Sequence, residues 1–190
     1  MKKFLILYAS IAFVLTFASC TESAPKQEDT KKVAEEHNDA KFNAAKETDA
    51  QFMVNAAEIN LEEIKLGELA ATSGMAADVK KLGTMMKTEH AKALKDLQGL
   101  ATTKQITIPG SITDDGQAAY TKLMAKKGKD FDKDYSDMMV DGHKKAIEKF
   151  EKATTNVTDP EIKAWATSML PALRMHLDAS MACQKMHAKM

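Results

Sequence analysis

Four stretches of this chain place apolar residues three or four positions apart over about twenty residues or more, and this periodicity restricts the folds open to it. Such spacing puts the apolar side chains on one face of an α-helix, and that face must be buried against other helices. The 190 residues include only four Pro and eight Gly, so little interrupts helix formation. The sequence therefore predicts an all-α fold with four long helices.

The first two helices are separated by a tight turn. The first is expected to open at Thr48 or Asp49, because Thr48-x-x-Gln51 has the spacing of a capping box, and to end at Ser73-Gly74. The second is expected over residues 76–101, and so short a link predicts antiparallel neighbours. Their apolar stripes are Phe52, Ala56, Ile59, Glu63, Leu66 and Ala70, and then Val79, Gly83, Met86, His90, Ala93, Leu97 and Leu100.

The last two helices are expected over residues 130–153 and from Thr158 onward. Asp130 suits an N-cap, and Thr158-Asp159-Pro160-Glu161 offers a capping box with Pro in the first turn. Pro171 predicts a kink in the last helix. The stripes are Phe131, Tyr135, Met139, His143, Ala146 and Phe150, and then Ile162, Ala166, Met169, Leu173, His176, Ser180 and Cys183.

Residues 102–128 connect the second long helix to the third. Gly and Pro punctuate this connection, and residues 117–127 within it are predicted to form a short helix. A connection of about 27 residues is far longer than the usual loop of a helix bundle. Ferritin-like bundles use one long crossover of this kind, so we predict a ferritin-like four-helix bundle with the long connection between helices 2 and 3.

The start of the chain has a different composition. A basic beginning, an apolar run from Phe4 to Phe17 and small residues before Cys20 are typical of a secretory signal. A Cys at this place resembles the bacterial lipobox, in which the signal is cleaved and the Cys is lipidated, although Phe17 departs from the usual aliphatic residue. In the alternative interpretation, Cys20 merely ends an ordinary signal peptide.

Three segments follow from these observations. Residues 1–19 are predicted to be a lipoprotein signal peptide, residues 20–48 a lipidated Cys and a polar tether, and residues 49–187 the bundle domain. Residues 21–48 contain too few apolar side chains to fold alone, although residues 31–46 lack Pro and Gly and suit a loose helix.

The expected location is the bacterial cell envelope, on the periplasmic side and at the outer membrane, with lipid on Cys20 as the membrane anchor. Lys and Arg total 27, as do Asp and Glu, so nucleic acid is not an expected partner. No sequence feature identifies a protein partner.

Each of the four stripes is interrupted by one polar residue: Glu63, His90, His143 and His176. All four fall in the central half of the bundle, spread over roughly 7–10 Å of its height. A lone buried carboxylate is costly unless it is paired or metal-bound, and neutral imidazole is a common ligand of transition metals. The four residues predict a site for a single Zn, Cu, Fe or Mn ion, or alternatively a metal-free polar layer in which Glu63 accepts hydrogen bonds from the histidines.

Other metal and catalytic motifs find less support. Di-iron bundles require Glu-x-x-His on two helices, but Lys87, Val140 and Leu173 stand three residues before the three histidines. No phosphate-binding loop, nucleophile elbow or Cys-x-x-Cys occurs, so no catalytic residue is indicated and a non-enzyme is favoured. A second candidate, for Cu(I), is the tail with Met175, Met181, Cys183, Met186, His187 and Met190, which loose packing of Met at a helix end also explains.

Four segments carry a resemblance to a known family: Glu63-Ile-Lys-Leu-Gly-Glu-Leu-Ala70, Met86-Lys-Thr-Glu-His90, Phe131-Asp-Lys-Asp-Tyr135 with Met139-Val-Asp-Gly-His143, and Leu170-Pro-Ala-Leu-Arg-Met-His176. The chain is similar to the bacterial exported proteins grouped as domain of unknown function 4142. The resemblance covers about residues 49–180, and implies a ferritin-like bundle in the cell envelope without an established activity. The tail after Ala179 lies outside it.

Two functional hypotheses follow. In the first, a lipid-anchored bundle binds or stores a metal ion through Glu63, His90, His143 and His176. In the second, a non-metal structural or stress-associated envelope protein acts through protein contacts, and the same polar residues only fix the register of the bundle.

Overall fold

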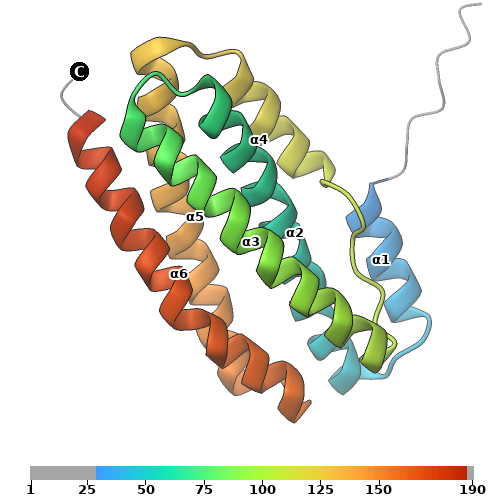
Figure 1. Cartoon of the computed structure of the whole chain (residues 1–190). Helices are drawn as coiled ribbons and strands as arrows, with labels where there is room; N and C mark the ends of the chain where they lie inside the picture. The colour runs from blue at the N-terminus through green and yellow to red at the C-terminus, as the bar shows by residue number, and fades with distance from the viewer. Residues whose placement is uncertain (1–28, 188–190) are drawn as a thin grey trace, which may run out of the picture.

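The computed structural model describes residues 29–187, and these residues form six helices and no strand. Four of the helices are long and two are short, and Figure 1 shows how they are arranged. The prediction of an all-α, ferritin-like four-helix bundle is confirmed. The helices are α1 (Thr30–Asp39), α2 (Ala44–Ser73), α3 (Ala77–Lys104), α4 (Asp114–Met124), α5 (Gly128–Asn156) and α6 (Pro160–His187).

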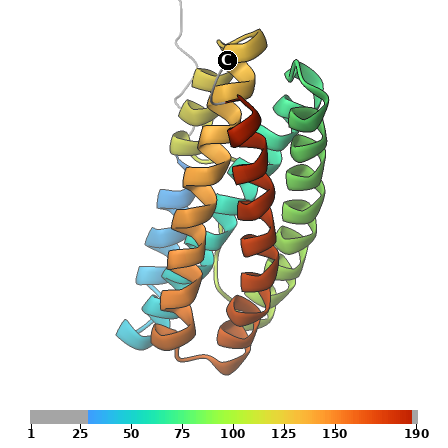
Figure 2. The same cartoon turned by 90° about the vertical axis from the view of Figure 1, so that its left-hand side faces the viewer.

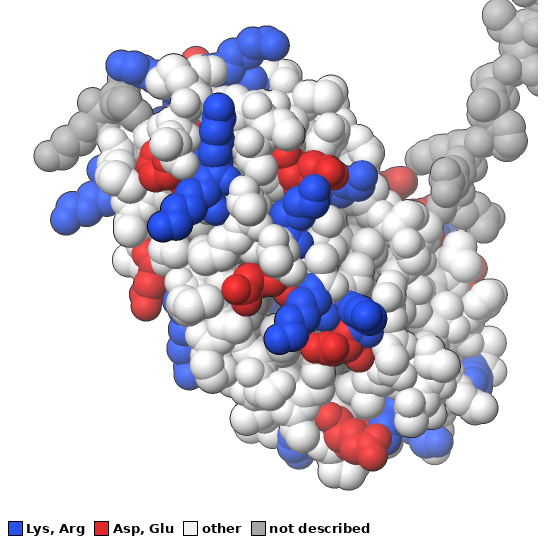
Figure 3. Space-filling view, in the orientation of Figure 1, with Lys and Arg blue, Asp and Glu red and all other residues white. Residues whose placement is uncertain are grey.

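The four long helices form two antiparallel hairpins, α2–α3 and α5–α6, which pack against each other (Figures 1 and 2). The short helix α4 lies in the long connection between the hairpins, and both α1 and α4 pack against α2. Helix α2 therefore buries more than the single predicted stripe, and Met53, Val54 and Ala57 are fully buried as well. On the face in Figure 3, acidic and basic side chains are interspersed.

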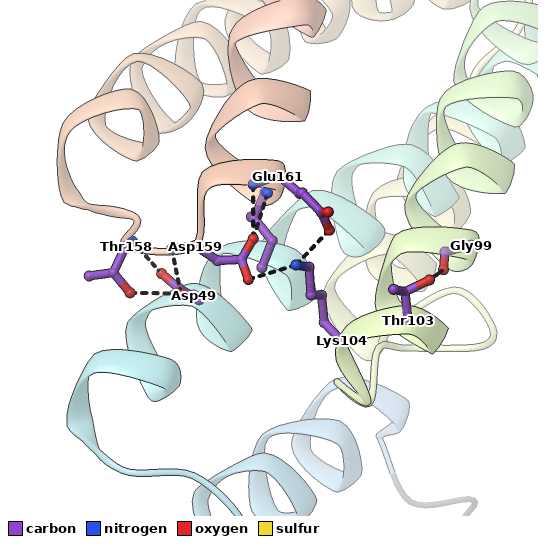
Figure 4. A network of polar contacts seen from close by, with 8 residues as sticks. Asp49, Gly99, Thr103, Lys104, Thr158, Asp159 and Glu161 are labelled. Atoms are coloured by element: carbon purple, nitrogen blue, oxygen red, sulfur yellow. Dashed lines mark hydrogen bonds and ion pairs between the residues drawn. The ribbon is translucent and has the colours of Figure 1, made fainter.

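Each hairpin turn is held by a buried carboxylate from the other hairpin. Asp49 of α2 accepts hydrogen bonds from the backbone N–H of Thr158 at 2.7 Å and that of Asp159 at 2.9 Å (Figure 4). At the other end of the bundle, Asp132 of α5 accepts from the N–H groups of Met75 and Ala76, both at 2.8 Å. Turn amides that would lack a helical partner are satisfied in this way, and the two hairpins are fixed in register.

Helices α2 and α3 approach each other closely at Gly67 and Gly83. A Cβ atom on Gly83 would lie 2.7 Å from the carbonyl oxygen of Gly67 and 2.7 Å from the backbone nitrogen of Ala71. Only a residue without a side chain fits at that separation. Because His90 lies two helical turns beyond Gly83, this contact helps to place it in the interior.

Helix ends differ from the predicted ones by a few residues. Helix α2 begins at Ala44, where Oδ1 of Asn43 accepts from the N–H of Lys46, and the Thr48 hydroxyl donates to the carbonyl of Ala44 rather than forming a capping box. Asp159 caps the start of α6, where its Oδ1 accepts from the N–H groups of Glu161 and Ile162. The connection spans residues 105–127, and its short helix begins three residues earlier than predicted.

The segment predicted to be a polar tether is folded in part. Helix α1 packs against α2, and Asn38 is buried, with Nδ2 donating to the carbonyl of Thr107 at 2.8 Å and Oδ1 accepting from its N–H at 2.9 Å. These long-range contacts, invisible in a polar sequence, bring residues 30–48 into the domain. His37 is exposed, as expected for a residue among charges.

The predicted signal peptide and Cys20 lie outside the described residues. Among residues 29–187, no helix combines the length and apolar character needed to cross a membrane.

Candidate metal centre

Three of the four predicted ligand residues meet inside the bundle. His90 comes from α3, His143 from α5 and His176 from α6, and their exposed fractions are 2%, 1% and 2%. One ring nitrogen of each lies within 4.8 Å of the other two. The three imidazoles thus come from both hairpins and surround one point in the interior.

Hydrogen bonding fixes which nitrogen of His90 carries the proton. The amide of Asn60 donates from Nδ2 to the carbonyl of Ala56 at 2.7 Å, which leaves Oδ1 of Asn60 facing Nδ1 of His90 at 3.0 Å. Because a carbonyl oxygen only accepts, Nδ1 of His90 must be the donor. In the neutral ring, Nε2 of His90 then carries a free lone pair.

The same argument applies to His143. Its Nδ1 lies 2.8 Å from the backbone carbonyl of Met139, one turn earlier in α5. This partner is also an acceptor only, so Nδ1 holds the proton and Nε2 presents a lone pair. Second-shell hydrogen bonds of this kind commonly orient metal-binding histidines in proteins.

The two free lone pairs belong to atoms that face each other. Nε2 of His90 lies 3.4 Å from Nε2 of His143. Two nitrogens each about 2.05 Å from a tetrahedral ion are separated by about 3.3 Å, so the spacing already suits a shared metal.

His176 completes the group. Both of its ring nitrogens are buried, and neither has a hydrogen-bond partner among the described residues. Burying a polar group without a partner costs about 1–3 kcal/mol, so the arrangement requires compensation. The nearest carboxylate is Glu89, whose Oε2 is 3.9 Å from Nε2 of His176 and whose side chain is half exposed at the surface between α3 and α6.

Burial keeps the three histidines neutral. It lowers the pKa of His90 well below its usual value, assisted by repulsion from His143 and His176. It also lowers the pKa of His143 to about 4, although the Met139 carbonyl favours the charged form. The pKa of His176 is lowered by burial as well. Neutral imidazole is the form that binds metals.

Glu63 lies beside the three histidines rather than among their facing nitrogens. Its Oε1 is 3.7 Å from Nδ1 of His143, on the opposite side of that ring from the nitrogen facing His90. Gly142 leaves room for this carboxyl group, because a Cβ there would lie 3.2 Å from Oε1 of Glu63. Burial, with a further contribution from Glu62, raises the pKa of Glu63 well above its ordinary value. Its role as a ligand remains a prediction.

A small cavity of about 20 Å³ adjoins two of the three histidines. His90, His176, Asn60 and Glu89 are among the residues that line it. That volume accommodates roughly one water molecule, which suits the fourth position of an ion held by three protein ligands.

Sequence reasoning missed the role of Asn60. It lies three residues before Glu63, hence on the same side of α2, and is 3% exposed. Its position on that face was a usable signal, whereas its hydrogen bond to His90 joins two different helices and is not visible in sequence.

The C-terminal tail does not gather its methionines. Met175, Met181 and Met186 are 48%, 48% and 56% exposed, while Cys183 and His187 are buried. The predicted combination of thiol and thioether ligands for Cu(I) is therefore not assembled in the described residues, and Met190 lies outside them.

A comparison with protein families bears on this arrangement. The model of the family described as Domain of unknown function (DUF4142) matches residues 33–182, most of the chain. The chain belongs to the DUF4142 family. The match begins inside α1 and ends one residue before Cys183, so it includes the three central histidines and Glu63.

No curated protein and no solved structure matches this DUF4142 chain. The family description assigns no activity, so a function must be argued from the geometry of the site.

Proposed function

We propose that this DUF4142 protein binds a single transition-metal ion through Nε2 of His90, Nε2 of His143 and one ring nitrogen of His176. The observation that carries the proposal is the 3.4 Å separation between Nε2 of His90 and Nε2 of His143. In each of these two rings the other nitrogen, Nδ1, faces a hydrogen-bond acceptor. Two lone pairs at this distance repel each other unless a cation lies between them.

A proton is a poor substitute for that cation. If Nε2 of one ring donated to the other, that ring would either become positively charged or lose its Nδ1 hydrogen bond. The first is opposed by burial, which lowers the pKa of both rings. The second would leave the Asn60 amide oxygen or the Met139 carbonyl facing a bare nitrogen lone pair.

The donor set narrows the choice of ion. Three neutral nitrogens suit Zn, Cu or Fe better than Mn, which prefers oxygen ligands. A divalent ion in an apolar core also needs nearby negative charge, and Glu63 beside His143 supplies it once the ion favours its ionised form. We therefore assign Glu63 to the outer shell and the histidines to the ion itself.

Metal analysis of the full-length chain, produced without a polyhistidine tag, tests the proposal. We expect the double variant His90→Ala and His143→Ala to hold one ion fewer per chain than the wild type. His37→Ala, a change at an exposed histidine on α1, is the matched control and leaves the metal content unchanged. Circular dichroism verifies that each variant is folded.

Metal titration of the wild type gives an outcome independent of substitutions. After chelation, Zn, Cu, Fe or Mn is added back and thermal unfolding is followed. A protein that binds through these histidines unfolds at a higher temperature with at least one of the four. Indifference to all four ions contradicts the proposal and leaves the metal-free polar layer as the role of the histidines.

We also propose that the domain is anchored to the bacterial cell envelope by lipid on Cys20, facing the periplasm. The support is the basic and apolar start of the chain with small residues before Cys20. Metabolic labelling with a fatty-acid analogue is expected to mark the wild type and not Cys20→Ser. Equal labelling of both proteins, or labelling of neither, would refute the anchor.

A further inference from the structure

A second group of ligand-type side chains lies where α3 begins and α6 ends. Asp78 is in the first turn of α3, and Cys183 and His187 are one turn apart on α6. Oδ2 of Asp78 is 2.9 Å from Nε2 of His187 and 3.5 Å from Sγ of Cys183. One atom from each of the three lies within 4.8 Å of the others.

These separations are close to those of a tetrahedral zinc site. With Zn–S near 2.3 Å and Zn–O or Zn–N near 2.05 Å, a sulfur and an oxygen ligand lie about 3.6 Å apart, and an oxygen and a nitrogen about 3.3 Å. The Cys183 to Asp78 distance needs almost no change. The Asp78 to His187 distance needs to grow by only about 0.4 Å when an ion replaces the hydrogen bond.

The group is largely enclosed and is not fully satisfied internally. Cys183 is 3% exposed and His187 is 4% exposed. Nδ1 of His187 is buried and has no hydrogen-bond partner among the described residues. The hydrogen bonds within the group therefore satisfy Nε2 of His187 and not the whole ring.

The local charge favours a divalent cation. Asp78 keeps a lowered pKa through its hydrogen bonds from His187 and Cys183, despite the opposing effect of burial, and Asp132 adds a second carboxylate nearby. Asp132 already accepts from two backbone N–H groups, so it contributes charge rather than a ligand atom. Burial and Asp78 raise the pKa of Cys183 to about 12, so the thiol is protonated without a metal and must release its proton to solvent when an ion binds.

We propose that Asp78, Cys183 and His187 form a second metal site, which binds Zn²⁺ and joins the start of α3 to the end of α6. Thiolate, imidazole and carboxylate together suit this borderline ion, and the exposed methionines of the tail are not needed. Cys183 follows His176 by seven residues, or about 10 Å along the helix, so the site is separate from the three histidines.

Cobalt substitution distinguishes the two sites, because a thiolate ligand gives Co²⁺ a charge-transfer band in the near ultraviolet and three imidazoles do not. We expect the full-length reduced chain to show this band on addition of Co²⁺ and to lose it on addition of Zn²⁺. The band persists in Cys20→Ser, which excludes the other cysteine, and in His90→Ala with His143→Ala. The band disappears in Cys183→Ser. In Asp78→Asn the apparent affinity for Co²⁺, measured from the band, falls at least tenfold.

Thermal unfolding supplies a second measurement that does not depend on the Cys183 variant folding. In the chain carrying Cys20→Ser, His90→Ala and His143→Ala, Zn²⁺ is expected to raise the unfolding temperature. Adding the control substitution Met181→Leu, on the exposed side of α6, is expected to leave this shift unchanged. Absence of both the cobalt band and this shift overturns the second site. A band that survives in Cys183→Ser overturns it equally.

Discussion

Glu63 is ionised only at a cost in the metal-free protein, because it is buried and has no hydrogen-bond partner for Oε2 among the described residues. Folding raises the pKa of Glu63 above its ordinary value of 4.5. Above pH 4.5 the unfolded chain therefore releases a proton that the folded chain still binds. The folded state therefore loses stability as pH rises above 4.5. A bound ion beside His143 reverses this effect by favouring the carboxylate.

Substitution Glu63→Gln is expected to have opposite effects on stability and on metal binding. The amide mimics the protonated acid, so the metal-free variant is more stable than the wild type at pH 8 in urea unfolding. Without the negative charge, metal affinity falls about 10- to 100-fold. Glu47→Gln, at an exposed position of the same helix, is the control for α2. A variant that loses stability and keeps its affinity would show that Glu63 serves the bundle alone.

The histidines give the metal-free protein a pH dependence of the opposite sign. The pKa of His143 falls to about 4 in the folded chain from 6.5, so between these values the unfolded chain binds more protons. The resulting loss of stability, as pH falls from 6.5 to 4, is about 3 kcal/mol for this residue.

Urea unfolding of the metal-free wild type and His143→Gln across pH 4 to 7 measures this loss. The comparison isolates one residue, since other titrating groups are common to both proteins. We expect the wild type to lose more stability than the variant on acidification. Parallel curves would mean that His143 titrates normally in the folded chain.

At the scale of the helix pair, the contact of α2 with α3 depends on Gly83. Substitution Gly83→Ala places a methyl group 2.7 Å from two backbone atoms of α2, which side-chain rotation does not relieve. We expect a loss of about 3 kcal/mol or more in the free energy of unfolding, together with weaker metal binding because His90 moves with α3.

Gly99→Ala is the matched control for this prediction. It lies on the same helix, is exposed, and its added Cβ would meet nothing within 4 Å. Alanine favours helix over glycine, so this variant is expected to gain about 0.5–1 kcal/mol. If Gly83→Ala and Gly99→Ala change the free energy of unfolding in the same direction, the close approach of α2 and α3 does not determine the stability of the pair.

For the whole molecule, the carboxylates that hold the hairpin turns decide how the two halves are joined. Asp132→Asn removes the charge and one of two acceptor oxygens facing Met75 and Ala76, and is expected to cost about 2–3 kcal/mol in urea unfolding. Asp141→Asn, at an exposed position of the same helix, is expected to change stability by less than about 0.5 kcal/mol. Equal effects at the two positions would contradict the role of Asp132.

The histidines were predictable because each stands at an apolar position of a regular helix. Once helical period fixes which face is buried, His90, His143 and His176 must point inward, and the short turns bring them to similar heights. Glu63 was predicted by the same argument, but its exact height and rotation depend on how α2 packs against α5. A shift of one helical position decides whether such a carboxylate meets an ion or only the far side of an imidazole.

The sequence by itself determined the four long helices, their order, the long connection and one interior-facing stripe on each long helix, because these follow from the local period of apolar side chains. Only the tertiary structure decided that α1 joins the domain, that Asn60 orients His90, and that Asp78 meets Cys183 and His187. Each of these contacts joins residues far apart in the chain through polar groups. Such groups leave no periodic pattern, since their positions are selected by distance and direction in the folded molecule.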